Sequence, residues 1–310
     1  MSDLISIVTP CYNEEGNIEE LVRQVREVFQ RMNHEHYEHI FIDNASTDKS
    51  QIILRRLAKE DKKIKVIINN RNFGHIRSPF YGLLQAKGDA VILLVADLQD
   101  PPEMIETFIQ KWREGFKVVL GVKTESKESP LMFAIRTAYY DFVGRVSDTK
   151  LTKNNTGFGL YDQCVIQTLR EIDDPYPYFR GLISELGYPA FKIAYTQPAR
   201  KRGVTSNNFY KLYDIAMLGI TSHSKVPLRL ATMAGFVLSV LSFFTAIFYL
   251  VIKLLFWDRF QVGLASAGIG IFFFMSVQLF FIGIIGEYVG FIHTQVMKRP
   301  LVTEKERINF

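Results

Sequence analysis

The chain of 310 residues has few cysteines, no recognisable signal peptide and no glycine-rich nucleotide-binding motif. Its two cysteines, Cys11 and Cys164, are too few for a disulfide framework and favour a reducing compartment. The first residues, MSDLISIVTP, lack the positive segment and long apolar core of a signal peptide, so we expect the N-terminal part to stay in the cytoplasm. No GxGxxG follows the first expected strand and GxxxxGK[ST] is absent, which removes the main support for dinucleotide and P-loop sites.

A strong charge imbalance is also missing. The 37 Lys and Arg residues against 32 Asp and Glu give a net charge of +5, spread along the chain. This excess is too small to indicate nucleic acid as a partner, but it is compatible with an anionic membrane surface or substrate. The six histidines show no zinc-ligand spacing, and no repeat or low-complexity stretch is present.

Charged residues are absent from two long stretches near the C-terminus. Residues 230–252 and 262–286 contain no Asp, Glu, Lys or Arg. At about 1.5 Å per residue, each helix would be ~35 Å long, enough to cross a hydrocarbon core of ~30 Å. The sequence therefore predicts a transmembrane helical hairpin over residues 228–297, with its turn around 257–261.

Basic residues flank this hairpin unevenly. Near its two ends lie Lys225, Arg229, Lys298, Arg299, Lys305 and Arg307, and they outnumber Lys253 and Arg259 at the turn. The positive-inside rule then places both termini in the cytoplasm. Residues 200–227 form a basic juxtamembrane segment in which 209–218 has one apolar face, and we expect that part to lie in the membrane interface. Residues 298–310 are expected to be a cytoplasmic tail.

The first 199 residues are expected to form one α/β domain. Short β-branched or apolar runs alternate with stretches of helical periodicity up to about residue 121, which is typical of a mostly parallel sheet with helices on both faces. Strands are predicted at 5–9, 39–43, 64–68, 90–96 and 116–121, and helices at 17–32, 50–60 and 78–87. Residues 130–195 give no clear pattern apart from an aromatic, amphipathic segment at 133–146.

Polar residues follow three of these strands at the point where each strand ends. The sequences are PCYNEE at 10–15, DNASTD at 43–48 and DLQDPP at 97–102. Because the carboxyl ends of parallel strands share one edge of a sheet, and ligands bind beyond that edge, we expect these carboxylates to converge on one site.

These motifs, in this order, resemble those of the inverting GT-A family 2 glycosyltransferases that load a sugar onto a polyprenyl phosphate. PCYNEEGNI, FIDNASTDKS, ADLQDPPE and the C-terminal hairpin are most similar to the bactoprenol-phosphate glucosyltransferase branch, which is related to dolichyl-phosphate mannose synthase. The resemblance covers essentially the whole chain. It implies a GT-A nucleotide-sugar-binding domain, a UDP-sugar donor, undecaprenyl phosphate as lipid acceptor, and transfer of a hexose, glucose first, at the cytoplasmic membrane face.

The same resemblance assigns roles to residues at the strand ends. The base and ribose of the donor are expected against Pro10, Tyr12, Glu14 and Asp43, where carboxylates accept hydrogen bonds from the nucleotide. Capping of turns is the alternative for Asp43 and Asp48. Asp97, with a catalytic role, and Gln99 are expected to hold Mg²⁺ or Mn²⁺, hard cations that prefer oxygen ligands.

Basic residues are expected to hold the donor diphosphate and the lipid phosphate. The resemblance implies catalytic roles for Arg136 and Arg200 and donor-binding roles for Lys123 and Arg202, with a solvated or membrane-facing basic surface as the alternative. A phosphate monoester has a second pKa of about 6 and is largely dianionic near neutrality, so such a nucleophile needs no general base. Residues 155–162 match the acceptor-side segment of the family loosely, and whether any residue, Asp162 included, acts as a general base stays open.

The chain departs from the family pattern at three places. Val95 stands where the family has an acidic residue, which bears on metal affinity or nucleotide preference. Lys123 replaces the usual arginine, and Val204-Thr205-Ser206 replaces Glu-Ser-Lys, so a lysine contact is lost.

Two other functions stay open at this point. A processive membrane polysaccharide synthase is disfavoured because only two spans are expected and no QxxRW motif occurs. A non-catalytic membrane scaffold that senses nucleotide sugars is supported by Val95. The sequence does not identify the sugar or the oligomeric state, although Gly286 and Gly290 form a GxxxG pattern that allows homo-oligomers in the membrane.

Overall fold

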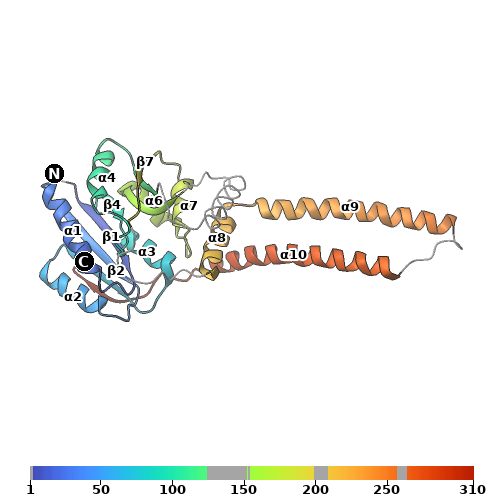
Figure 1. The fold of residues 1–310 in the computed structure, drawn as a ribbon, viewed down its shortest axis with the longest axis horizontal. Helices are drawn as coiled ribbons and strands as arrows, with labels where there is room; N and C mark the ends of the chain where they lie inside the picture. Colours follow the sequence, from blue (N-terminus) through green and yellow to red (C-terminus); the bar gives the residue numbers. More distant parts are fainter. Residues whose placement is uncertain (1–2, 124–151, 153, 199–208, 257–263) are drawn as a thin grey trace.

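The structure is a computed structural model that describes residues 3–123, 152, 154–198, 209–256 and 264–310. It consists of an α/β domain from which a long helical hairpin extends (Figure 1). The predicted segment at 133–146 and the hairpin turn at 257–261 lie outside the described residues.

One sheet of eight strands forms the centre of the α/β domain, in the order β7-β5-β6-β4-β1-β2-β3-β8. β1 to β4 run parallel to one another, β5 and β7 run in the same direction, and β6 and β8 run opposite. This confirms the mostly parallel sheet. The strands are β1 Ile5–Cys11, β2 Tyr37–Asp43, β3 Ile64–Asn69, β4 Ala90–Leu93, β5 Val118–Lys123, β6 Asn155–Asp162, β7 Ala190–Tyr195 and β8 Glu304–Ile308.

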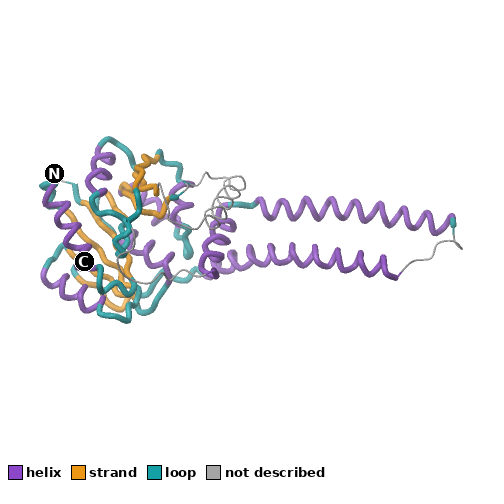
Figure 2. The backbone as a smooth tube through the Cα atoms, viewed as in Figure 1, coloured by secondary structure: helices purple, strands orange, loops and turns teal. Residues whose placement is uncertain are grey.

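Helices cover both faces of this sheet (Figures 1 and 2). On one face lie α1 (Ile18–Arg31), α2 (Ser50–Glu60) and α4 (Met104–Arg113), and on the other α3 (Gly74–Gln85), α6 (Gln163–Ile172) and α7 (Phe179–Glu185). Successive strand residues point to opposite faces, so in β2 Phe41 packs in one buried cluster while Ile40 and Ile42 pack in the other. Burial on both faces explains why the strands read as continuous apolar runs.

The first five predicted strands and the first three predicted helices are confirmed, with bounds shifted by a few residues. β4 is the largest deviation among the strands, since it ends at Leu93 rather than at residue 96. The chain leaves the ladder there and turns, with Leu98 in the left-handed region at φ 59°. β6, β7, α6 and α7 were not predicted, because glycines in NTGFGLYD and short helices weaken the periodic signal.

The C-terminal residues, expected only as a tail, contain the strand β8. It pairs antiparallel with β3 at the edge of the sheet. Its side chains add contacts to the domain: Arg55 bonds Glu306 at 2.7 Å, the Tyr81 hydroxyl donates to Glu304 at 2.8 Å, and Asn309 donates to the Ile64 carbonyl at 2.8 Å. The chain therefore returns from the hairpin into the same domain that precedes it.

The hairpin consists of α9 (Val226–Leu255) and α10 (Leu264–Met297), and α8 (Phe209–His223) lies across its base (Figure 1). Val226–Leu255 and Gly270–Met297 are long and apolar enough to cross a membrane, judged by length and composition. Large apolar side chains such as Phe236 and Phe272 are 71% and 73% exposed along it, a surface that suits an apolar environment better than water. The Tyr288 hydroxyl donates to the Ser224 carbonyl at 2.6 Å and fixes the base of the hairpin.

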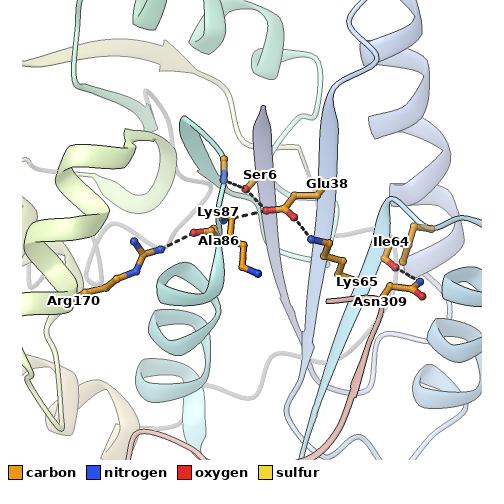
Figure 3. Close-up of polar contacts among 9 residues, drawn as sticks. Ser6, Glu38, Ile64, Lys65, Ala86, Lys87, Arg170 and Asn309 are labelled. Atoms are coloured by element: carbon orange, nitrogen blue, oxygen red, sulfur yellow. Dashed lines mark hydrogen bonds and ion pairs between the residues drawn. The ribbon is translucent and has the colours of Figure 1, made fainter. Parts of the chain in front are cut away.

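A buried polar network closes the end of the sheet where β1 and β2 begin (Figure 3). Glu38, only 4% exposed, accepts hydrogen bonds from the Ser6 hydroxyl, the Lys65 ammonium and the Lys87 backbone N–H. Burial raises the pKa of Glu38, but the bonds from Lys65 and Ser6 outweigh it, so that the pKa lies below its ordinary value. The network ties three neighbouring strands to the loop that follows α3.

Candidate functional site at the strand ends

The carboxyl ends of six strands and the amino ends of β6 and β8 meet at one edge of the sheet, here called the strand-end rim. The register shows this directly, since Cys11 pairs with Asp43, Val122 with Asn155, and Lys123 with Tyr195. The polar side chains that the rim gathers are those of Tyr12, Glu14, Asp43, Asn69, Asp97, Gln99, Asp100, Lys123, Asn155 and Tyr195. The predicted convergence of the three strand-end motifs is therefore confirmed by the topology.

The loops after β1 and β2 are bonded to each other. The Asn13 N–H donates to the Ser46 hydroxyl at 2.9 Å, and the Thr47 N–H donates back to the Asn13 side chain at 2.8 Å. Asn13 reaches this position with φ 56°, a conformation that asparagine tolerates better than most residues. The pairing holds the first two motifs in one unit and leaves the Tyr12 ring 42% exposed beside them.

Asp43, expected to contact the nucleotide, is fully buried and supports the turn that follows β2. Its Oδ1 accepts from the Ser46 N–H and from the Gln51 side chain, both at 3.0 Å, while Oδ2 lies 4.0 Å from the Cys11 sulfur. Burial raises the pKa of Asp43, and the bonds from Ser46 and Gln51 oppose the rise. Turn capping is thus present at Asp43, and its nucleotide role stays a prediction.

The neighbouring acidic residues of these two loops are also held in place. Asp48 accepts from the Ser50 N–H at 2.9 Å and from the Glu15 N–H at 3.1 Å, which is the capping role given as its alternative. Glu14 accepts from the Asn17 side chain at 2.6 Å. Pro10 lies within β1, one residue before the end of the strand.

The loop after β4 presents Asp97 at the rim. Asp97 is half-buried, and its Oδ1 accepts from the Gln99 N–H at 3.1 Å, so both predicted metal ligands belong to one tight turn. Asp100 is only 3% exposed and accepts from the Tyr195 hydroxyl at 2.6 Å. Burial raises the pKa of Asp100 to about 6, the charge of Asp97 adds to the rise, and the Tyr195 bond opposes it.

The side-chain oxygens of Asp97 and Gln99 suit a magnesium or manganese ion whose other ligands are phosphate oxygens and water. Within the described ranges, no three His, Cys, Asp or Glu side chains form a group that could hold a metal. The Asp97 carboxylate and the Gln99 amide oxygen would supply the one or two protein oxygens that such ions commonly take, with bound phosphates and water as the remaining ligands. The Val95 side chain offers no further oxygen, so the set fits a metal shared with a diphosphate.

Cations at the rim come from β5 and α7. Lys123 ends β5 and donates to the Gln197 side chain at 2.7 Å, and its charge acts to lower the pKa of Asp100. Arg180 on α7 donates to the Asn155 carbonyl at 3.1 Å. Arg180 was not predicted as a site residue, because only the placement of β6 between β4 and β5 brings its partner to the rim.

Three predicted phosphate-binding residues, Arg136, Arg200 and Arg202, lie outside the described residues, and their roles stay predictions. Asp162 lies at the opposite end of β6 from the rim and caps α6. It accepts from the Cys164 N–H at 3.0 Å, the Trp112 indole at 2.7 Å and the Lys117 ammonium at 2.9 Å. The structure thus gives Asp162 a supporting role as a helix cap.

Comparison with known proteins identifies relatives over nearly the full chain. The family model described as Glycosyl transferase family 2 matches residues 6–169. An uncharacterized glycosyltransferase, YkcC, of Bacillus subtilis is 35% identical over 298 residues, covering 96% of this chain and 91% of the relative. The SfII prophage-derived bactoprenol glucosyl transferase of Shigella flexneri is 33% identical over 297 residues, 96% of both chains.

Among solved structures, glucosyl-3-phosphoglycerate synthase from Mycobacterium tuberculosis, in complex with Mn²⁺, UDP and phosphoglyceric acid, is similar with a TM-score of 0.49 and 16% identity. The match covers 71% of this chain and 76% of that chain. The family assignment rests on the sequence matches and not on this likeness.

Proposed function

The chain belongs to glycosyl transferase family 2 and is a glycosyltransferase, and we propose that it transfers glucose from UDP-glucose to undecaprenyl phosphate at the cytoplasmic face of a membrane. The glucosyl group and the lipid carrier follow the name of the Shigella relative, a bactoprenol glucosyl transferase. The transfer proceeds with inversion at the anomeric carbon.

The observation that carries this proposal is the point where the hairpin rejoins the sheet. Glu304 opens β8 opposite Asn69, the last residue of β3, so the chain leaving α10 enters the sheet at the strand-end rim. A lipid held in the membrane beside the hairpin is therefore delivered to the edge of the sheet that carries Asp97. Sheets of this type bind ligands at that same edge.

The topology supports a hairpin whose two ends face one side of the membrane. β8 follows the second span and pairs with β3, which precedes the first span. If one segment crosses, the other must cross back, because both strands belong to one sheet. The basic residues near the hairpin ends favour the cytoplasmic side.

Asp97 and Gln99, with the donor diphosphate, would hold Mg²⁺ or Mn²⁺. Such an ion, when bound there, would supply positive charge that stabilises the leaving diphosphate. Lys123 adds a further positive charge at the rim, while the exposed Tyr12 ring offers a flat surface for the base. Asp100, held by Tyr195, keeps the loop after β4 in place.

In the reaction, an oxygen of the lipid phosphate attacks the anomeric carbon. The bond from that carbon to the UDP oxygen breaks, and UDP leaves with the bonding electrons. The dianionic phosphate is the nucleophile, so the protein positions reactants and stabilises charge and does not remove a proton. This agrees with the capping bonds that occupy Asp48 and Asp162.

A transfer assay with the purified full chain tests the proposal. The protein in detergent is incubated with labelled UDP-glucose, Mg²⁺ or Mn²⁺, and undecaprenyl phosphate, alongside UDP-galactose, UDP-N-acetylglucosamine and a mannose donor. Label in an organic-extractable product from UDP-glucose supports the proposal. Label in a long water-soluble polymer favours a polysaccharide synthase, and UDP binding without any transfer favours a scaffold.

A further inference from the structure

Arg77 carries a guanidinium group whose hydrogen bonding is incomplete. It lies in the first turn of α3, which begins just after the carboxyl end of β3 and so borders the strand-end rim. The side chain is half-buried, and its Cζ lies 5.1 Å from the centre of the Tyr176 ring. Its Nε is buried, and among the described residues no acceptor lies within hydrogen-bonding distance of it.

The Tyr176 loop, residues 173–178 between α6 and α7, is attached to the membrane hairpin. Asp174 in this loop accepts from the Gln295 side chain of α10 at 2.9 Å. Burial raises the pKa of Tyr176, the charge of Asp214 on α8 adds to the rise, and the charge of Arg77 opposes it. Arg77 therefore lies where the rim, the Tyr176 loop and the helices at the base of the hairpin meet.

A second arginine, packed against the same helix, shows what a purely structural role requires. Arg170, from α6, packs at the other end of α3, where its Nε donates to the Leu84 carbonyl at 3.0 Å. Its Nη2 donates to the Ala86 carbonyl at 2.6 Å (Figure 3). A buried N–H without an acceptor is unfavourable, because it has lost its bonds to water and gained none in return. Stacking on Tyr176 orients the Arg77 guanidinium but leaves its Nε unpaired.

We propose that Arg77 binds the phosphate of the lipid acceptor and positions it for attack on the donor. A guanidinium offers paired N–H groups that match phosphate oxygens, and Tyr176 holds the plane of the group. The inference rests on the proposed function, since it adds a positioning residue on the acceptor side. It favours the acceptor over the donor because the Tyr176 loop is bonded to α10, along which the lipid arrives.

Arg77→Gln is the test variant, and Arg71→Gln is its matched control. Arg71 lies in the loop just before α3, and its substitution removes the same charge. Unlike Arg77, however, it is exposed, and its Cζ lies 4.1 Å from the centre of the Phe73 ring. We expect Arg77→Gln to raise the KM for undecaprenyl phosphate about tenfold or more, the scale of lost charge-assisted hydrogen bonds. The KM for UDP-glucose should stay within about twofold, as should both KM values of the control.

A binding measurement gives a readout that does not depend on turnover. The full chain in detergent is titrated with farnesyl phosphate and with farnesol. Wild type and Arg71→Gln should bind the phosphate more tightly than the alcohol, and in Arg77→Gln this preference should fall about tenfold or more. Arg77→Lys should recover part of the preference, because it restores the charge without the fork of N–H groups.

The outcomes separate the two proposals. A phosphate preference that is undiminished in Arg77→Gln overturns the role of Arg77. The same holds if Arg77→Gln lowers only the unfolding temperature, as Arg170→Gln should, while the acceptor KM is unchanged. If wild type transfers sugar to no polyprenyl phosphate, the proposed function fails, and the farnesyl phosphate titration still decides whether Arg77 binds a phosphate.

Discussion

The two ends of the sheet use charged residues differently. At the end where β1 and β2 begin, Glu38 is buried and bonded to a hydroxyl, an ammonium and a backbone N–H. At the strand-end rim, Asp97 is half-exposed and bonded to its own turn, and the Arg77 Nε has no acceptor among the described residues. Glu38 is thus fully hydrogen-bonded within the protein, whereas Asp97 and Arg77 can still bind a ligand. We therefore expect substitutions of Glu38 to change stability and substitutions of Asp97 and Arg77 to change activity.

Asp97→Asn should have the largest effect, on activity alone. Asparagine keeps an oxygen that can accept from the Gln99 N–H, so the turn is preserved, but it removes the negative charge that a metal–diphosphate complex needs. We expect glucosyl transfer to fall by about a hundredfold or more, the scale seen when a key electrostatic group is lost. Initial rates at saturating metal measure this, with the unfolding temperature as control. Near wild-type rates would remove Asp97 from the site.

Removal of residues 304–310 should lower both the stability of the domain and its activity on the lipid. The truncation exposes the edge of β3 and breaks the bonds from Glu306 to Arg55 and from Glu304 to Tyr81. We expect a lower unfolding temperature and a loss of transfer to lipid, with UDP binding retained by the rest of the rim. Full transfer by the truncated chain would show that the return of the chain into the sheet does not position the acceptor.

Glu38→Gln should destabilise the protein without changing turnover per folded molecule. The variant leaves the Lys65 ammonium without its buried partner, a change that is unfavourable by about 3 kcal/mol. Glu27→Gln is the matched control, since its pair with Arg23 is exposed to solvent and contributes little to stability. Denaturant unfolding of both variants, with activity corrected for folded fraction, measures the difference. A turnover defect in folded Glu38→Gln would contradict the division between the two ends.

The smallest effect should appear in the acid dependence of stability. Burial alone would raise the pKa of Asp162, but bonds from Cys164, Trp112 and Lys117 lower it to about 2. Because the folded-state pKa lies below the unfolded value near 4, the stabilisation is present above pH ~4 and disappears as the pH falls toward 2. Asp162→Asn should flatten the stability curve in that window. If the free energy of unfolding of Asp162→Asn falls as steeply as that of wild type between pH ~4 and ~2, Asp162 does not cause this pH dependence.

The sequence predicted the parts of the molecule in which one local pattern decides the structure. Continuous β-branched runs identified β1 and β3, and the strand-end motifs located Asp97 at the rim. It did not predict β8, whose charged sequence EKERI suits an exposed edge and carries little apolar signal. Arg77 and the full burial of Asp43 also escaped prediction, because both depend on which loops and helices the fold brings beside them.

The central claim is that this chain joins a sugar to a membrane lipid at the strand-end rim. The most direct test is mass spectrometry of lipids extracted after the full chain, in vesicles containing undecaprenyl phosphate, has reacted with UDP-glucose and Mg²⁺. The account predicts undecaprenyl phosphate bearing one hexose, formed by wild type and absent with Asp97→Asn. Release of UDP without a hexose-bearing lipid, or equal product from Asp97→Asn, would contradict it.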